Sequence, residues 1–193
     1  MIIEDYKTIF IHIPKNAGTS IKNYFGMGGQ KDIEPLKQHD TIYDIKEKIP
    51  NKYKSYGKFA IIRNPYDRMV SWFHYLKIKT NPTNFITGEV NEEQFEFKNN
   101  VDFQSWLKDP LKYFMYPKEF LNTQCSWIDD TVDILKYENL KNDLENFFKK
   151  EIKIPHVNNS NHDDYLAYYD DQCLNLVYEK YKEDFEKFNY KKI

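Results

Sequence analysis

A short run of small and polar residues, Lys15-Asn16-Ala17-Gly18-Thr19-Ser20, combines several groups that bind anions. Gly18 lets the main chain approach a ligand closely, and the free N–H groups at the start of a helix favour negative charge. Thr19 and Ser20 add hydroxyl donors, and Lys15 adds a mobile positive charge. Together these groups predict a cradle for a phosphate or a sulfate. An ordinary strand-to-helix turn with a Thr/Ser cap is the alternative.

A second candidate site lies at residues 61–71, where both arginines of the chain occur. The sequence has 28 Lys plus Arg, and only Arg63 and Arg68 are arginine. Lysine suffices wherever a cation is merely solvated, so a position that is arginine is a candidate for needing the planar, bidentate guanidinium. Arg63 ends a predicted strand, where its side chain can meet a phosphate with two hydrogen bonds. For Arg68, a helix-surface ion pair with Asp67 or with a C-terminal acid is favoured, and Ser71 follows two turns into the helix.

Other chemistries fit the sequence less well. In the Walker A motif a lysine directly precedes Ser or Thr, whereas Lys15 precedes Gly18, and no clear Walker B carboxylate follows. A metal-dependent kinase or ATPase is therefore disfavoured. The two cysteines, Cys125 and Cys173, are isolated and are expected to be reduced thiols. The five histidines, at positions 12, 39, 74, 156 and 162, are scattered, so no zinc site is predicted.

Both candidate sites lie where a predicted strand runs into a predicted helix. Apolar runs predict strands at 8–13, 58–62 and 131–137. Helical spacing predicts helices after residue 20, ended by the glycines at 26, 28 and 29, and at 41–49, 65–78, 102–109, 117–124, 139–150 and 170–185. Residues 79–100 are predicted as an irregular excursion or lid. Alternating strands and helices predict an α/β fold, with a parallel sheet covered on both faces, in a single domain over 1–193.

Composition argues against several classes of protein. The 28 basic and 30 acidic residues give a net charge of −2, which lends no support to general nucleic-acid binding. No apolar run approaches the roughly 18 residues of a membrane span. The acidic start of the chain lacks the basic region of a signal peptide. A composition rich in Lys, Asn and Tyr fits a cytoplasmic enzyme better than a secretory one, so a cytoplasmic location is expected. The sequence does not indicate the oligomeric state.

Four blocks in order resemble the sulfotransferase family, in particular its carbohydrate sulfotransferase branch. Residues 10–20 look like its 5′-phosphosulfate loop, and residues 61–71 look like its 3′-phosphate motif. The resemblance continues in residues 133–140 and from 158 to 190. It implies a P-loop-like, three-layer α/β/α fold with a central parallel sheet. It also implies a sulfotransferase whose donor is 3′-phosphoadenosine 5′-phosphosulfate (PAPS), whose product is PAP, and which needs no metal.

The resemblance further implies roles for single residues. The loop from Lys15 to Ser20 would hold the 5′-phosphate, with Lys15 neutralising charge on the bridging oxygen as its bond to sulfur breaks. Arg63 and Ser71 would hold the 3′-phosphate. His39 resembles the base of the carbohydrate branch, and a base is what an attacking hydroxyl needs. His12 is expected to be structural, and His74 is the reserve candidate for the base.

The implied acceptor is a hydroxyl of a carbohydrate-like molecule such as a glycan, bound by residues 79–100 and 110–130. Contacts to the donor from Asn158 or Ser160 are also expected. A set of aromatic residues offers stacking faces for sugars, although a core role is favoured for them: Trp72, Trp106, Tyr113, Phe114, Tyr116 and Trp127. An ATP-dependent P-loop-type kinase and a non-catalytic nucleotide-binding scaffold are the alternatives.

Overall fold

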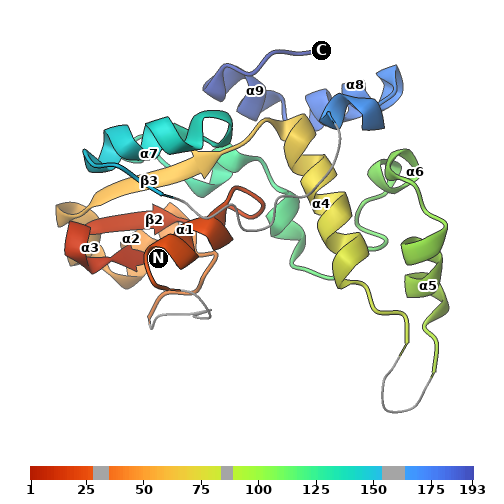
Figure 1. Cartoon of the computed structure of the whole chain (residues 1–193), viewed down its shortest axis with the longest axis horizontal. Helices are drawn as coiled ribbons and strands as arrows, with labels where there is room; N and C mark the ends of the chain where they lie inside the picture. Colours follow the sequence, from red (N-terminus) through yellow and green to blue (C-terminus); the bar gives the residue numbers. More distant parts are fainter. Residues whose placement is uncertain (28–34, 84–88, 154–163) are drawn as a thin grey trace. The chain divides into compact units, whose positions relative to one another are not determined.

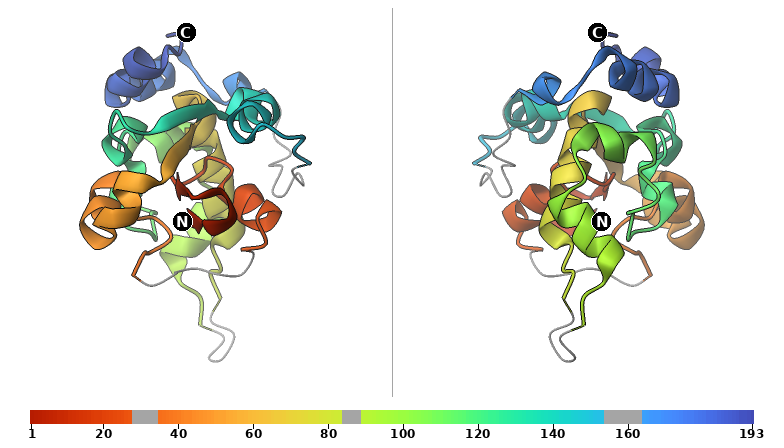
Figure 2. Two further views of the ribbon diagram at one scale, coloured as in Figure 1. Left: turned by 90° about the vertical axis from the view of Figure 1, so that its left-hand side faces the viewer. Right: turned by 90° about the vertical axis from the view of Figure 1, so that its right-hand side faces the viewer.

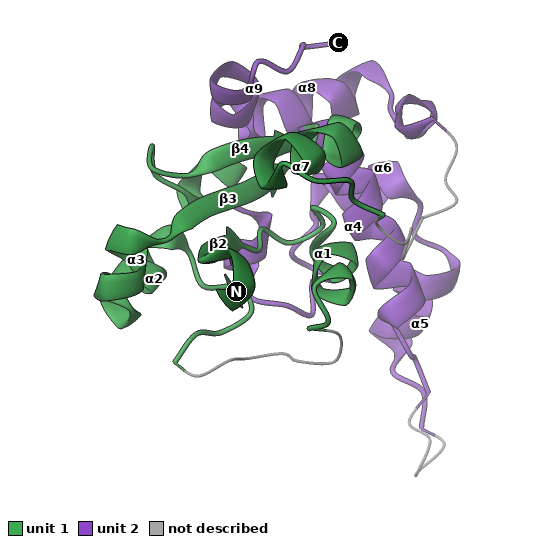
Figure 3. Ribbon diagram, turned by 60° about the vertical axis from the view of Figure 1, so that its left-hand side comes forward, with its two compact units in different colours: residues 1–64, 123–159 green, residues 65–122, 160–193 purple. Residues whose placement is uncertain are grey.

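The computed structural model of the chain describes residues 1–27, 35–83, 89–153 and 164–193. The chain divides into two compact units, coloured separately in Figure 3. Unit 1 comprises Met1–Asn64 and Thr123–Asn159, and unit 2 comprises Pro65–Asn122 and Ser160–Ile193. Each unit is therefore built from two separate stretches of sequence, and the chain changes unit after residues 64, 122 and 159.

Unit 1 contains a four-stranded sheet in the order β1-β2-β3-β4. The strands are β1 (Ile2–Ile3), β2 (Thr8–Ile11), β3 (Gly57–Ile62) and β4 (Asp133–Lys136), and Figure 1 labels β2 and β3. The last three strands are parallel, with Ile11 opposite Ala60 and Ile62 opposite Lys136. Strand β1 runs antiparallel to β2. The structure thus confirms the predicted parallel sheet and adds a short antiparallel edge strand.

Helices cover both faces of this sheet. Figure 2 shows α1 (Gly18–Tyr24) and α7 (Leu140–Phe148) on one side, with α2 (Ile42–Lys48) and α3 (Pro50–Ser55) on the other. Because strand side chains alternate between faces, one set from β2, β3 and β4 packs with α1 and α7. This core contains Phe10, Phe59, Ile61, Leu135, Ile21 and Leu144. The predicted three-layer α/β/α arrangement is confirmed within unit 1.

Unit 2 is helical. Its α-helices are α4 (Pro65–Lys79), α5 (Glu92–Asn99), α6 (Phe103–Lys108), α8 (Asp171–Lys180) and α9 (Lys182–Phe188). They enclose an aromatic-rich core that includes Tyr66, Phe73, Phe97, Trp106, Tyr181 and Phe185. Within the described residues, no helix is long and apolar enough to cross a membrane.

Short 3₁₀ helices complete the described elements. Unit 1 contains η1 (Glu4–Tyr6), η3 (Gln124–Trp127) and η4 (Tyr137–Asn139), and unit 2 contains η2 (Lys118–Leu121) and η5 (Tyr165–Tyr168). The α-helix predicted at 117–124 is wrong, because the extended residues Asn122 and Thr123 separate η2 from η3.

Two further helix predictions need correction. The excursion predicted at 79–100 contains helix α5, whose first turn is capped by the Asn91 side chain accepting from the N–H of Gln94 (2.9 Å). The single helix predicted at 170–185 is broken at Tyr181, whose ψ of 21° departs from helical geometry. The predicted helix at 41–49 is confirmed, with a capping box between Thr41 and Asp44 at its start. Gly26, at φ 69°, follows α1 as predicted, while Gly28 and Gly29 lie outside the described residues.

Candidate active site

The segment between β2 and α1 is a tight turn whose main chain is held by Asn16. Lys15 and Ala17, on either side, have φ of 70° and 58°, a left-handed conformation that residues with a Cβ seldom adopt. The buried Asn16 Nδ2 donates to the Ile61 carbonyl (2.7 Å) and to Oε1 of Gln124 (2.6 Å). These hydrogen bonds fix the turn against the end of β3 and offset the strain of its main chain.

The groups expected to bind an anion follow this turn into α1. Lys15 is half-buried, Thr19 is exposed and Ser20 is buried. No carboxylate occurs between residues 14 and 20. A set of ammonium, hydroxyl and main-chain N–H groups without a competing carboxylate fits the phosphosulfate end of PAPS.

Gly18 is required by the protein's own packing. A Cβ at this position would lie 1.6 Å from Nε2 of His12, so the imidazole occupies the space that a side chain would need. The prediction attributed Gly18 to the close approach of a ligand, whereas the structure shows that the buried His12 ring makes the same demand. His12 is therefore a packing residue, as predicted.

His12 also positions His39, which is half-buried in unit 1. The two rings lie 4.4 Å apart between centroids, and Nδ1 of His39 is 2.9 Å from the His12 carbonyl oxygen. A carbonyl only accepts hydrogen bonds, so Nδ1 of His39 carries the proton and Nε2 presents a lone pair. That lone pair faces the side-chain amide of Gln38, whose Nε2 is 3.1 Å away. His39 is thus held in the tautomer of a base.

The charge state of His12 follows from its surroundings. Burial lowers the pKa of His12 well below 6.5, and repulsion from His39, when that ring is protonated, lowers it further. Its Nδ1 has no hydrogen-bond partner among the described residues. His12 is consequently neutral at physiological pH and adds no charge beside His39.

Arg63 follows the carboxyl end of β3 and reaches the loop after β2. Its Nη1 donates to the Lys15 carbonyl (3.2 Å), and its guanidinium carbon lies 4.2 Å from the centroid of the Tyr137 ring. The two segments predicted to bind phosphates thus meet within unit 1. The planar guanidinium stacks on the aromatic face, an arrangement that lysine does not reproduce.

Three residues of this site carried no assigned role in the sequence analysis. Gln124 pairs its side-chain amide with the Arg63 main chain, Tyr137 stacks on the Arg63 guanidinium, and Oε1 of Glu138 accepts from the N–H of Asn64 (2.6 Å). Tyr137 and Glu138 belong to a block that resembles the family, which was the available signal for them. No pattern in the sequence pointed to Gln124, because its partners are 61 and 108 residues away.

The remaining predicted site residues lie elsewhere in the chain. Ser71 is buried on α4 of unit 2. His74, the reserve candidate for the base, is also on α4, where its Nε2 is 2.9 Å from the Tyr168 hydroxyl. Asn158 and Ser160, with His156 and His162 beside them, fall outside the described residues.

Arg68 is not at the helix surface, so the predicted surface position is wrong. Its side chain is 1% exposed and lies within the core of unit 2. It donates from Nη1 to the Asn122 carbonyl (3.0 Å) and from Nη2 to the Phe120 carbonyl (2.8 Å). The fork of the guanidinium therefore holds the segment that leads out of η2.

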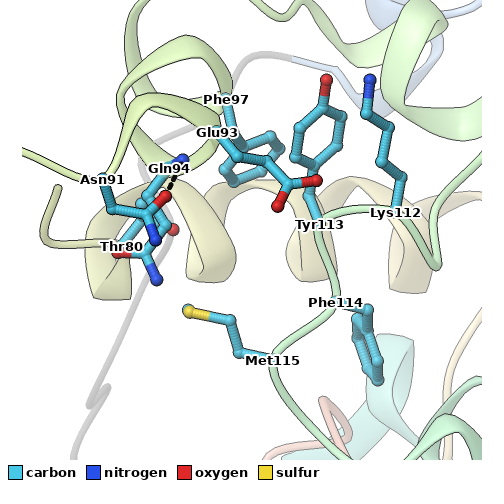
Figure 4. A pocket seen from close by; sticks show the side chains of 9 residues that line it. All are labelled: Thr80, Asn91, Glu93, Gln94, Phe97, Lys112, Tyr113, Phe114 and Met115. Carbon is cyan, nitrogen blue, oxygen red and sulfur yellow. Dashed lines mark hydrogen bonds between the residues drawn. The ribbon is translucent and has the colours of Figure 1, made fainter.

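Unit 2 contains a cavity of about 120 Å³ that draws on both segments expected to bind the acceptor (Figure 4). Its polar lining includes Asn91, Glu93, Gln94 and Lys112. In its aromatic lining, Tyr113 stacks on Phe97 at 4.9 Å, and Lys112 Nζ lies 5.0 Å from the Tyr113 centroid. The tryptophans proposed for sugar stacking, Trp72, Trp106 and Trp127, are all buried, which confirms their core role.

Cysteine and metal chemistry add nothing to the site within the described residues. Cys125 and Cys173 are free thiols, as predicted, and burial raises the pKa of Cys173 to about 11. No group of three or more His, Cys, Asp or Glu side chains able to hold a metal ion occurs in the described part of the chain.

In α/β proteins with a mostly parallel sheet, ligands bind at the carboxyl ends of the strands, which is where the turn at residues 15–18 and Arg63 lie. The model of the sulfotransferase family matches residues 1–125 of this chain. The chain belongs to the sulfotransferase family, and its general activity is sulfuryl transfer from PAPS. Comparison with curated proteins and with solved structures gave no match.

Proposed function

We propose that this enzyme transfers the sulfuryl group of PAPS to a hydroxyl of a carbohydrate-like acceptor, with His39 as the base. The observation that carries the proposal is the contact of the Arg63 guanidinium with the Lys15 main chain. It brings the two cationic segments together at the ends of adjacent parallel strands. A donor with phosphates at both ends of its ribose, as PAPS has, matches two such segments.

The residues of unit 1 divide the binding of the donor between them. Lys15, Thr19 and Ser20, with main-chain N–H groups of the loop from Asn16 to Gly18, would hold the 5′-phosphosulfate end. Arg63 would hold the 3′-phosphate. When bound, PAPS supplies the sulfuryl group, and its transfer leaves PAP. Lys15 would neutralise the negative charge that grows on the bridging oxygen, a stabilisation specific to the transition state.

His39 would take the proton of the attacking hydroxyl. Its Nδ1–H is held by the His12 carbonyl, so Nε2 is the atom that accepts the proton. As the acceptor oxygen bonds to sulfur, the bond from sulfur to the bridging oxygen breaks, and His39 becomes a cation. The hydroxyl must replace the Gln38 amide at Nε2, so the hydrogen bond of Gln38 marks the position that the acceptor would occupy.

The identity of the donor is tested by calorimetry with PAP, AMP and ATP, the last with and without magnesium. We expect PAP to bind more tightly than AMP, because only PAP has the 3′-phosphate. Arg63→Ala is expected to reduce that preference by about 10- to 100-fold, in line with the loss of a charge-assisted pair. Lys54→Ala removes an exposed lysine of unit 1 and serves as the control. A preference for ATP with magnesium would contradict the proposal and favour a kinase.

The base is tested by turnover of a panel of glycan acceptors. His39→Ala is expected to lower kcat by about 10²- to 10⁴-fold while PAP affinity changes little. His74→Ala is the matched control, because His74 is the other candidate. Full activity of His39→Ala together with inactivity of His74→Ala would show that His74, rather than His39, is the base. PAP binding without turnover on any acceptor would favour a non-catalytic scaffold.

A further inference from the structure

Gln124 occupies a buried position between the two segments that the proposed function assigns to the donor. It is the first residue of η3 in unit 1 and is completely buried. A polar side chain without solvent needs hydrogen-bond partners inside the protein, and the partners it finds show what it holds together.

The Gln124 amide pairs with the main chain of Arg63 in both directions. Oε1 accepts from the Arg63 N–H (2.9 Å), and Nε2 donates to the Arg63 carbonyl (2.9 Å). A neighbouring strand would make the same pair of hydrogen bonds, so the side chain continues the sheet by one residue beyond the end of β3. These hydrogen bonds fix the main chain of Arg63, and therefore the Cα from which its guanidinium side chain extends.

The same amide also holds the turn at Asn16, between β2 and α1. Oε1 of Gln124 accepts a second hydrogen bond, from Nδ2 of Asn16 (2.6 Å). Nδ2 of Asn16 donates in addition to the Ile61 carbonyl (2.7 Å), two residues before Arg63. One side-chain oxygen therefore joins the turn after β2 to the residue after β3.

Other side chains of similar size cannot make this set of contacts. Methionine has the same length but neither donates nor accepts strongly, and asparagine is one methylene shorter. A glutamate would accept both hydrogen bonds, but when ionised it could not donate to the Arg63 carbonyl. It would also place a buried negative charge in a site for an anionic donor. The neutral amide is the group that satisfies all three partners.

We propose that Gln124 is a positioning residue that couples the loop at Asn16 to Arg63, so that the 5′- and 3′-phosphate segments become ordered together. The inference rests on the proposed function for the identity of the ligand. It goes further in assigning the alignment of the two segments to a residue outside the set proposed to hold the donor.

The coupling is tested first in the ligand-free protein, by amide hydrogen exchange. Gln124→Met is expected to reduce protection of the Arg63 N–H by at least about tenfold, because its acceptor is removed. Asn16→Ala is expected to reduce the protection of the Arg63 N–H as well. The hydrogen bonds of the Asn16 side chain go to Ile61 and Gln124, so this effect would reach Arg63 through its neighbours. Tyr53→Phe is the control, since it removes a hydrogen bond to Asp129 (2.8 Å) elsewhere in unit 1.

The second measurement is a double-mutant cycle on PAP affinity. The changes in binding free energy caused by Asn16→Ala and Arg63→Ala are expected to be non-additive in the wild-type background. In the Gln124→Met background they should be closer to additive, because only the contact of Arg63 with the Lys15 carbonyl still links the two segments. Gln124→Met alone should raise Kd for PAP and KM for PAPS by at least about tenfold. A merely structural role would lower the melting temperature while leaving both constants of the folded fraction unchanged, and that result would overturn the proposal.

Failure of the coupling and failure of the proposed function give different results. If the wild-type protein does not bind PAP, the proposed function fails, and hydrogen exchange still tests the coupling. If PAP binds but Asn16→Ala leaves the protection of Arg63 unchanged, the coupling is refuted and the donor assignment stands. Asn16→Ala also tests the coupling should Gln124→Met fail to fold.

Discussion

At the scale of single residues, the contact between Gly18 and His12 gives the sharpest structural test. A methyl group at position 18 would overlap the imidazole of the buried His12 at 1.6 Å. Alanine usually favours a helix over glycine by about 1 kcal/mol, but the overlap should outweigh this. We expect Gly18→Ala to reduce the free energy of unfolding by about 1–3 kcal/mol in denaturant titrations.

A matched substitution separates this overlap from a general effect of alanine. At Gly57 the nearest atom to an added Cβ is Thr8 Oγ1 at 3.5 Å, an ordinary contact. Gly57→Ala should therefore change stability by no more than about 0.5 kcal/mol. The double variant Gly18→Ala/His12→Ala should be less destabilised than the sum of its parts, and simple additivity would contradict the steric explanation.

The neutral, buried His12 should also make stability depend on pH. Its folded pKa is lowered, so below about pH 6.5 the unfolded chain gains a proton that the folded protein does not. Its contribution to stability is complete above this pH and falls as the pH decreases, by up to about 1.4 kcal/mol per unit. We expect the stability difference between wild type and His12→Gln to be flat from pH 7 to 8.5 and to change between pH 6.5 and 5.5. A difference that stays constant over the whole range would refute this assignment.

At the scale of secondary-structure elements, Arg68 connects α4 to the segment that follows η2. Its two nitrogen atoms hold the carbonyls of Asn122 and Phe120. An ammonium group lacks the rigid fork, so Arg68→Lys should lose at least one of these hydrogen bonds. We expect a loss of about 1.5–3 kcal/mol in the free energy of unfolding.

The control for this prediction is Lys79→Met, which removes an exposed cation from the same helix. It should change stability by less than about 0.5 kcal/mol. Unchanged stability of Arg68→Lys would show that positive charge, rather than the buried fork, is what position 68 requires.

The elements that sequence predicted best were those whose signals are local. β2, β3 and α4 follow from apolar runs and from Asn64-Pro65, and the candidate loop at residues 15–20 and Arg63 follow from residue types at strand ends. The errors involve distant partners. Arg68 looked like a surface residue because Asn122 and Phe120 lie more than fifty positions away. The break at Tyr181 accompanies a hydrogen bond from its hydroxyl to the Leu121 carbonyl, which local periodicity cannot reveal.

At the scale of the whole molecule, the interleaved chain favours cooperative unfolding. Neither unit is a continuous stretch of sequence, since the chain changes unit three times. We expect one transition, as predicted for a single domain. The fluorescence of Trp127 reports on the unfolding of unit 1, and that of Trp72 and Trp106 on the unfolding of unit 2. The unfolding midpoints of variants with tryptophan in only one unit can therefore be compared. Coincident midpoints by fluorescence and circular dichroism are expected, and PAP should raise both. Separate midpoints would show that the units unfold independently.

The pairing of Gln124 with Arg63 also bears on how the polypeptide could be rebuilt. Residues 65–122 leave unit 1 just after Arg63 and return just before Gln124, and these two residues are hydrogen-bonded. In terms of chain architecture, residues 65–122 are an insertion whose two attachment points on unit 1 nearly touch. The portion that matches the family, residues 1–125, would by itself lack β4 and the phenylalanines of α7 that pack on Phe59. A transplantable module that keeps the whole described part of unit 1 would instead join residues 1–64 to 123–153 through a short linker.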